Sequence, residues 1–266
     1  MDPKKIRTYI IYIAFAMVLI ALVLYLTVGR ASQNSAVYGT YVGPAELSAL
    51  YALSHNTTLA NADGTSLYSG LNLSSYFRHV SNNLTAPSVP TLTYVGAEYC
   101  PYCATARWGL ILAMMRFGNF TGIEYMASSP TDVYADTPTF SFVNASYSSK
   151  YFKFVSYEIE TRNETALQKP NGTALALFDT YSNGIPFLAF DNNIVADGTL
   201  IDPTILDGHN WGAITSSAAV KNTTISDAVI GAANIYTAEI CNMINNTDTN
   251  VCAQSYVKSV QSKMAQ

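Results

Sequence analysis

The sequence has few charged residues for its length. Of its 266 residues only 12% are Asp, Glu, Lys or Arg, whereas ordinary soluble domains carry about 25%. Hydrophobic residues make up 49%, including 19 Tyr and 11 Phe, which is enough to fill a core and excludes a highly charged disordered chain. The sequence pI of about 5.3 excludes a basic nucleic-acid binder, so we expect no nucleic-acid partner.

Histidine and cysteine are scarce as well. His55, His79 and His209 show no spacing typical of metal ligands, and His209 is expected to be a surface or capping residue. A zinc site built on one Cys-x-x-Cys pair needs a second closely spaced pair, but Cys241 and Cys252 have ten residues between them. We therefore expect no metal and no cofactor.

One long run carries no charge at all. It extends from Thr8 to Gly29, and its 22 residues would form about 33 Å of helix, enough to cross a membrane. Three basic residues precede the run and only Arg30 follows closely, which places the N-terminus in the cytoplasm and the C-terminal domain outside. The alternative is a cleaved signal peptide, but Arg30 interrupts the cleavage pattern. We expect an uncleaved single-pass anchor in the cell membrane, surrounded by lipid.

Uncharged polar residues take the place of the missing charges. The chain has 20 Asn, 24 Ser and 26 Thr, and nine Asn-x-Ser/Thr triplets where about four are expected by chance. In an exported glycoprotein such triplets accept glycans; the alternative is a polar surface without sugar. The nine acceptors are Asn56, Asn72, Asn83, Asn119, Asn144, Asn163, Asn171, Asn222 and Asn245.

The chain divides into three regions. Residues 1–30 are the cytoplasmic stub and anchor. Residues 31–87 are expected to form a juxtamembrane linker with a short helix over 44–53, the rest being loop with one helical turn near 76–80. Residues 88–266 alternate between strand and helix patterns, which predicts an α/β domain with a helical C-terminal extension. The expected strands are 91–97, 123–126, 139–143 and 151–160, with a hairpin over 184–195. The expected helices are 101–117, ended by Gly118, then 174–181, 211–219, 226–245 and 254–264.

The motif Cys100-Pro101-Tyr102-Cys103 lies where the first strand meets a helix. A helix N-terminus stabilises a thiolate, and two intervening residues place the second cysteine one turn further on, where it can resolve a mixed disulfide. Pro101 suits the first helical position because its missing N–H is no loss there. We expect Cys100 to be the exposed nucleophile and Cys103 the buried resolving thiol. A structural bridge and a metal site are the alternatives.

The segment from Tyr94 to Cys103, followed about eighty residues later by Ile185-Pro186 at the start of a hairpin, resembles the thioredoxin fold. The resemblance implies that Pro186 is cis and faces the cysteines, and that the backbone of Ile185 holds an extended substrate peptide. The Pro101-Tyr102 dipeptide is similar to that of glutaredoxins and would border the substrate.

A longer run, GAEYCPYCA at 96–104 with Arg107-Trp108 and RFGNF at 116–120, resembles a prokaryotic, largely archaeal family of membrane-anchored thioredoxin-like proteins of unknown function. The likeness covers most of residues 44–255. It implies a redox role without naming a substrate. The chain departs from thioredoxins proper in carrying Tyr99 in place of Trp and in a long insertion before Pro186.

Two further features have open interpretations. Glu98 could relay protons to Cys103, or it could be a strand-end residue paired with Arg107. Cys241 and Cys252 flank a turn-rich loop, so outside the cell they are expected to form a structural disulfide worth roughly 3 kcal/mol; the alternative is a second redox pair.

Together these features predict an extracytoplasmic thiol–disulfide oxidoreductase that acts on thiols and disulfides of exported proteins and exchanges electrons with a membrane donor or acceptor. Two other hypotheses remain open. One is a non-catalytic binding module or chaperone of thioredoxin fold. The other is a protein that delivers metal or electrons to a membrane oxidase.

Overall fold

The computed structural model describes residues 9, 12–20, 37–64, 70–81, 84 and 87–265. The chain forms two compact units, residues 1–38 and 39–266. In the first unit, residues 12–20 are helical with exposed side chains, whereas residues 8, 10–11 and 21–29 of the expected anchor lie outside the described part. No helix among the described residues is both long and apolar enough to cross a membrane.

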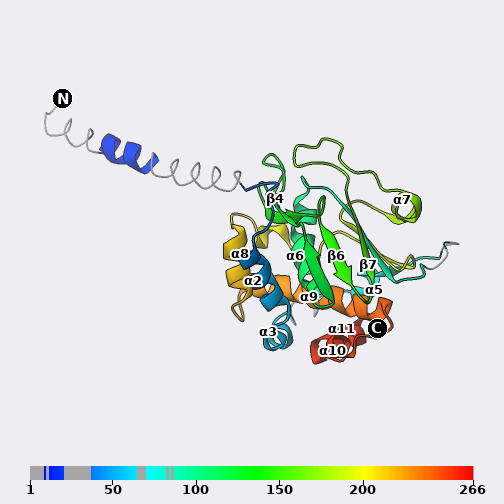
Figure 1. Cartoon of the computed structure of the whole chain (residues 1–266). Coiled ribbons are helices and arrows are strands. Elements are labelled where there is room, and N and C mark those ends of the chain that lie inside the picture. Colours follow the sequence, from blue (N-terminus) through cyan, green and yellow to red (C-terminus); the bar gives the residue numbers. More distant parts are fainter. Residues whose placement is uncertain are drawn as a thin grey trace. The chain divides into compact units, whose positions relative to one another are not determined.

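A mixed five-stranded sheet forms the centre of the second unit (Figure 1). The central strand β2 runs parallel to β7 and antiparallel to β8, and the remaining pairs, β8 with β9 and β9 with β1, are antiparallel. Every residue of β2 after Thr91 is buried, as in a strand covered on both faces. In spatial order the strands are β1 (Arg78–His79), β9 (Ile194–Asp197), β8 (Phe187–Phe190), β2 (Thr91–Gly96) and β7 (Lys153–Glu158).

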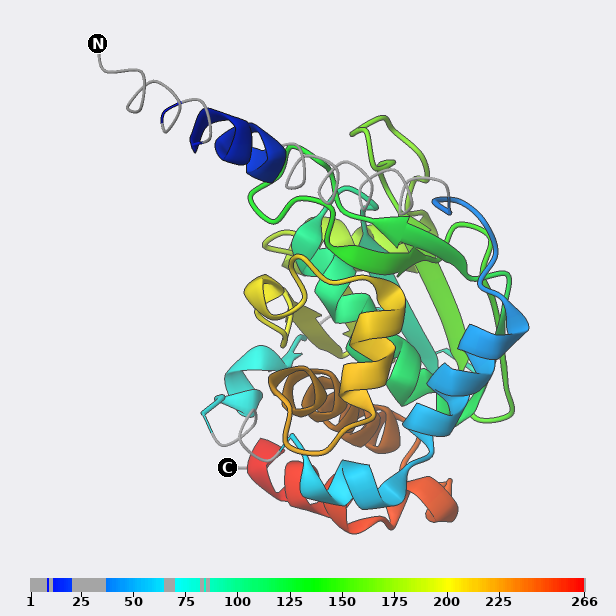
Figure 2. The same cartoon turned by 90° about the vertical axis from the view of Figure 1, so that its left-hand side faces the viewer.

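Helices cover both faces of this sheet, which confirms the α/β class. Helix α6 (Pro101–Met115) follows β2 and packs against α9 (Thr224–Met243), with α2 (Pro44–Ser54) and α8 (Trp211–Ala218) beside them (Figures 1 and 2). On the opposite face, α7 (Gly172–Tyr181) places Leu177 against Val95 and Phe187. Two short helices, α10 (Thr249–Cys252) and α11 (Ser255–Met264), follow α9.

Helix α6 is enclosed almost completely. All of its residues except Tyr102 are buried, including Trp108, whose indole N–H donates to the Pro138 carbonyl at 2.8 Å. The close packing of α6 on α9 depends on Gly109, because a Cβ there would lie 2.7 Å from the Cβ of Ala232. The helix that carries the cysteine motif is therefore held rigidly between the sheet and α9.

The expectation of a loop over residues 54–87 is wrong in part. Helices α3 (Thr57–Ala62) and α5 (Leu73–Tyr76) lie there, each begun by an asparagine whose side chain accepts a backbone N–H, Asn56 from Leu59 and Asn72 from Ser75. Of the helical turn expected near 76–80, only Tyr76 is helical, as the last residue of α5, and Arg78–His79 form strand β1 instead. The compact unit also begins at Gly39, well before the domain boundary expected at residue 87.

Gly118 does not serve as the expected helix terminator. It begins β3 (Gly118–Thr121), which pairs with β6 (Ser146–Ser149), neither of which was expected. A Cβ at Gly118 would lie 2.2 Å from the carbonyl oxygen of Ser148, so this strand pair requires a glycine at that position. A second two-stranded ribbon joins β4 (Glu124–Ala127) to β5 (Pro138–Ser141).

Candidate functional site

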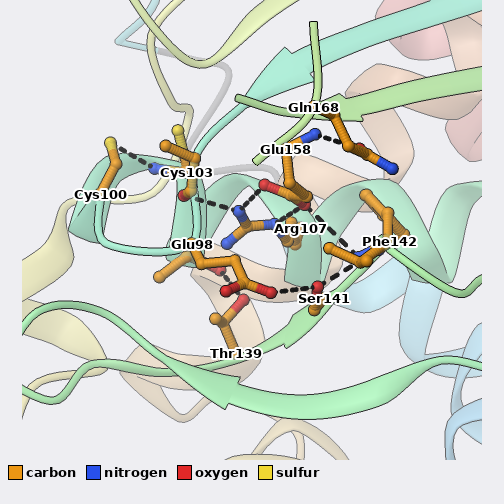
Figure 3. Close-up of polar contacts among 12 residues, drawn as sticks. Glu98, Cys100, Cys103, Arg107, Thr139, Ser141, Phe142, Glu158 and Gln168 are labelled. Atoms are coloured by element: carbon orange, nitrogen blue, oxygen red, sulfur yellow. Dashed lines mark hydrogen bonds and ion pairs between the residues drawn. The ribbon is translucent and has the colours of Figure 1, made fainter. Parts of the chain in front are cut away.

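The motif Cys100–Cys103 lies where β2 ends and α6 begins (Figure 3). Cys100 is the N-cap residue, and its sulfur accepts the backbone N–H of Cys103 at 3.2 Å. Pro101 occupies the first turn, as expected. Both cysteines are free thiols. The expectation of an exposed Cys100 is wrong, because both cysteines are buried. Cys100 keeps 5% of its surface exposed and Cys103 none, so Cys100 is the more accessible of the two.

The two thiols have opposite tendencies to ionise. The pKa of Cys100 is lowered, chiefly by the hydrogen bond from the Cys103 thiol, against the effect of burial; the backbone N–H of Cys103 and the charge of Arg107 add to the lowering. The pKa of Cys103 is raised well above its usual value, first by burial and then by its hydrogen bond with Cys100. This arrangement makes Cys100 the better nucleophile of the pair.

A buried ion pair lies directly behind the cysteines. Arg107 Nε donates to Glu158 Oε1 at 2.9 Å, and Nη2 donates both to Glu158 Oε2 at 2.5 Å and to the Ala97 carbonyl at 2.7 Å. Neither side chain of the pair is exposed. Burial is the largest single effect and acts to lower the pKa of Arg107. The charge and hydrogen bond of Glu158, together with Tyr94 and Cys103, outweigh it and raise that pKa, so the cation persists beside the thiols.

The sequence interpretation missed Glu158 as a site residue. Glu158 ends β7 and lies opposite Gly96 in the parallel pairing with β2, so its carboxylate reaches the same sheet edge as the motif. Its backbone N–H donates to Gln168 Oε1 at 2.7 Å, and the Phe142 N–H points at its Oε1 at 3.4 Å (Figure 3). The signal that could have identified it was a carboxylate near the end of the strand expected over 151–160.

The expected alternative that Glu98 pairs with Arg107 is wrong, because Arg107 forms its ion pair with Glu158. The Glu98 carboxylate instead accepts the Ser141 hydroxyl at 2.7 Å, and its side chain runs toward Ser141 (Figure 3). Among the described contacts no hydrogen bond joins Glu98 to Cys103, so a proton relay through it would need an intermediate.

The structure brings Ile185 to the cysteine pair. Its side chain packs against the buried cluster of Ala97, Cys100 and Cys103. The Ile185–Pro186 peptide bond is cis, as the resemblance implies, and Pro186 is buried at the start of β8. Ile185, which the resemblance places beside the cysteines, thus lies against them.

Aromatic side chains border the motif. Tyr102 is 42% exposed and its ring meets that of Tyr134 edge-on, with centroids 6.1 Å apart. The insertion that carries Tyr134 is tied to the motif by the Ser129 N–H, which donates to the Tyr99 carbonyl at 2.8 Å. The long insertion therefore builds part of the surface around Cys100.

The remaining predicted sites lie elsewhere. Cys241 and Cys252 form a disulfide, and both are buried, which favours a structural role over a second redox pair. Within the described ranges no three His, Cys, Asp or Glu side chains cluster in a way that could hold a metal ion. Asn83 lies outside the described residues, whereas the other eight glycan acceptors are exposed, as is His209.

Comparison with known proteins gives one match. Residues 75–179 match a family described as "Domain of unknown function (DUF929)". This stretch includes both cysteines of the motif, Arg107 and Glu158, and it ends before Pro186 and before the disulfide. Neither the curated proteins nor the solved structures contain a match to the chain.

Proposed function

We propose that the chain is a membrane-anchored, extracytoplasmic thiol–disulfide oxidoreductase with a thioredoxin-like fold, acting on exported proteins through Cys100 and Cys103. The observation that carries this proposal is the hydrogen-bonded pair of free thiols at the start of α6, with a lowered pKa for the outer thiol and a raised pKa for the inner one. The cis Pro186 and the packing of Ile185 on the pair support both the fold and the site.

The reaction proceeds in two exchange steps. The Cys100 thiolate attacks one sulfur of a substrate disulfide, a mixed disulfide forms, and the other substrate sulfur leaves as a thiolate. Cys103 then loses its proton and attacks the Cys100 sulfur, which closes the Cys100–Cys103 disulfide and releases the second substrate sulfur. The substrate gains the two electrons that the dithiol loses, and the reverse sequence oxidises a substrate dithiol.

Arg107 assists both steps through its charge. The guanidinium is buried beside the pair and favours the thiolate form of Cys100 and of Cys103. Its partner Glu158 keeps it in place. Reduction of a substrate leaves the Cys100–Cys103 disulfide, and oxidation of a substrate leaves the dithiol. A membrane dithiol or disulfide partner must therefore return the pair to its starting redox state.

The test is to trap substrates in the cell with the full chain carrying Cys103→Ala. Without the resolving thiol, mixed disulfides on Cys100 accumulate as reducible adducts. The control is Cys100→Ala with Cys103→Ala, in which these adducts must disappear. Absence of adducts would reject exchange; partners captured non-covalently by both variants would indicate a binding module, and metal bound stoichiometrically by the wild type would indicate a delivery protein.

A further inference from the structure

A cavity of about 470 Å³ lies at the opposite end of the sheet from the cysteines. It borders Phe190, which pairs with Leu92 near the start of β2, whereas the motif follows the end of that strand. Its walls come from α5, β1, the β8–β9 turn, the end of α9, and α11. Cavities of roughly 300–1,000 Å³ are the usual size of small-molecule sites.

The lining combines rings with one buried carboxylate. Phe77 and Phe190 meet edge-on with centroids 5.6 Å apart, and Met243 adds further apolar surface. Glu239 is 5% exposed, and its Oε2 accepts the Asn242 side-chain N–H at 3.1 Å. Burial raises the pKa of Glu239 to about 7, against the effect of that hydrogen bond.

The described lining of the cavity holds no permanently charged cation to balance this carboxylate. Among the described residues that line it there is no Lys or Arg, while Asp191 adds a second acidic group. An unpaired buried carboxylate is unfavourable unless it is protonated or receives a positive partner. A bare metal ion is a poor occupant, because no group of three potential ligands is found in the described part of the chain.

We propose that this cavity binds an organic ammonium ion with an apolar body, the ammonium group contacting Glu239 and the body lying against Phe77 and Phe190. The carboxylate supplies a charge-assisted hydrogen bond, and aromatic faces attract cations. This site does not depend on the proposed redox function, since it shares no residue with the cysteine motif.

Other titratable groups around Glu239 are few. His79 faces the cavity from β1 and Asp191 from the end of β8, whereas the α5 residues that line it, Leu73 and Ser74, do not titrate. On α11, Lys258 donates to Gln261 at 3.1 Å and also contacts Asn246 at 3.5 Å; the same helix carries Lys263. Because Glu239 must be ionised to hold a cation, affinity is expected to fall about tenfold per pH unit below about pH 7.

The experiment uses the full chain in lipid nanodiscs, with empty nanodiscs as blank. Isothermal titration at pH 8 compares 2-phenylethylammonium with the neutral 2-phenylethanol and the anionic 3-phenylpropionate. We expect the ammonium ion to bind about tenfold or more tightly than either comparison ligand. We also expect this preference to weaken at pH 5, a result that requires no variant.

Glu239→Gln keeps the shape and removes the charge, so the ammonium preference should disappear. The matched control is Glu124→Gln, because Glu124 is also buried, also accepts a side-chain N–H of an asparagine (Asn144, 2.8 Å), and does not line the cavity. It should leave the preference intact. Equal binding of the three ligands, no saturation at millimolar concentration, or an unchanged preference in Glu239→Gln would each overturn the proposal.

Discussion

The ion pair between Arg107 and Glu158 links α6, the helix that carries the cysteines, to β7 at the edge of the sheet. Replacing Arg107 by Met removes three hydrogen bonds and leaves the Glu158 carboxylate buried without a cation. Removing one partner of a buried ion pair costs roughly 3–5 kcal/mol. We expect the free energy of unfolding of Arg107→Met to fall by about that amount.

The double variant Arg107→Met with Glu158→Leu separates this penalty from lost packing. It removes both charges, so we expect it to be more stable than Arg107→Met alone, although the Ala97 carbonyl still loses a partner. The cycle compares the wild type with Arg107→Met, Glu158→Leu and the double variant. Urea unfolding of the dithiol form of each at pH 7, monitored by circular dichroism, gives the coupling free energy. A double variant whose loss equals the sum of the two single losses would refute the reasoning.

Three further predictions concern packing, covalent structure and pH. Gly109→Ala should lower stability by about 1–3 kcal/mol, because its Cβ would lie 2.7 Å from that of Ala232, and adding Ala232→Gly should restore part of the loss; no restoration would contradict this contact. Replacing Cys241 and Cys252 by Ser opens a loop spanning 11 positions and should cost about 3 kcal/mol in urea unfolding, so an unchanged midpoint would contradict a stabilising bridge. The native state holds a proton on Glu239 more tightly than the unfolded chain does, so its contribution is complete below about pH 4.5 and is lost as the pH rises to about 7. Between pH 4 and pH 8 the stability of the wild type relative to Glu239→Gln should therefore fall by about 3 kcal/mol, and parallel pH profiles of the two proteins would contradict this.

Local features of the site could be predicted from the sequence. Cys100, Pro101 and Cys103 are neighbours in the chain, and one strand-to-helix junction determines their geometry. The helices of the C-terminal third were also predictable, because apolar periodicity indicates which residues of a helix are buried.

Features that depend on contacts between distant segments could not be predicted. The sequence suggested only Glu98 as a partner of Arg107, but the parallel register of β2 with β7 brings Glu158 to Arg107 instead. Likewise, the role of Gly118 depends on a strand that begins at Ser146, a segment without a strong strand pattern of its own. Sequence periodicity identifies elements, but pairing between them is a property of the folded chain.

The central claim is that Cys100 and Cys103 form a reversible redox pair. The most direct measurement equilibrates the full chain, with Cys241 and Cys252 intact, in glutathione buffers of graded ratio and counts free thiols by alkylation and mass spectrometry. We expect a single two-electron transition in which Cys100 and Cys103 change together while Cys241 and Cys252 stay joined. A motif that remains entirely dithiol or entirely disulfide at every ratio would contradict it.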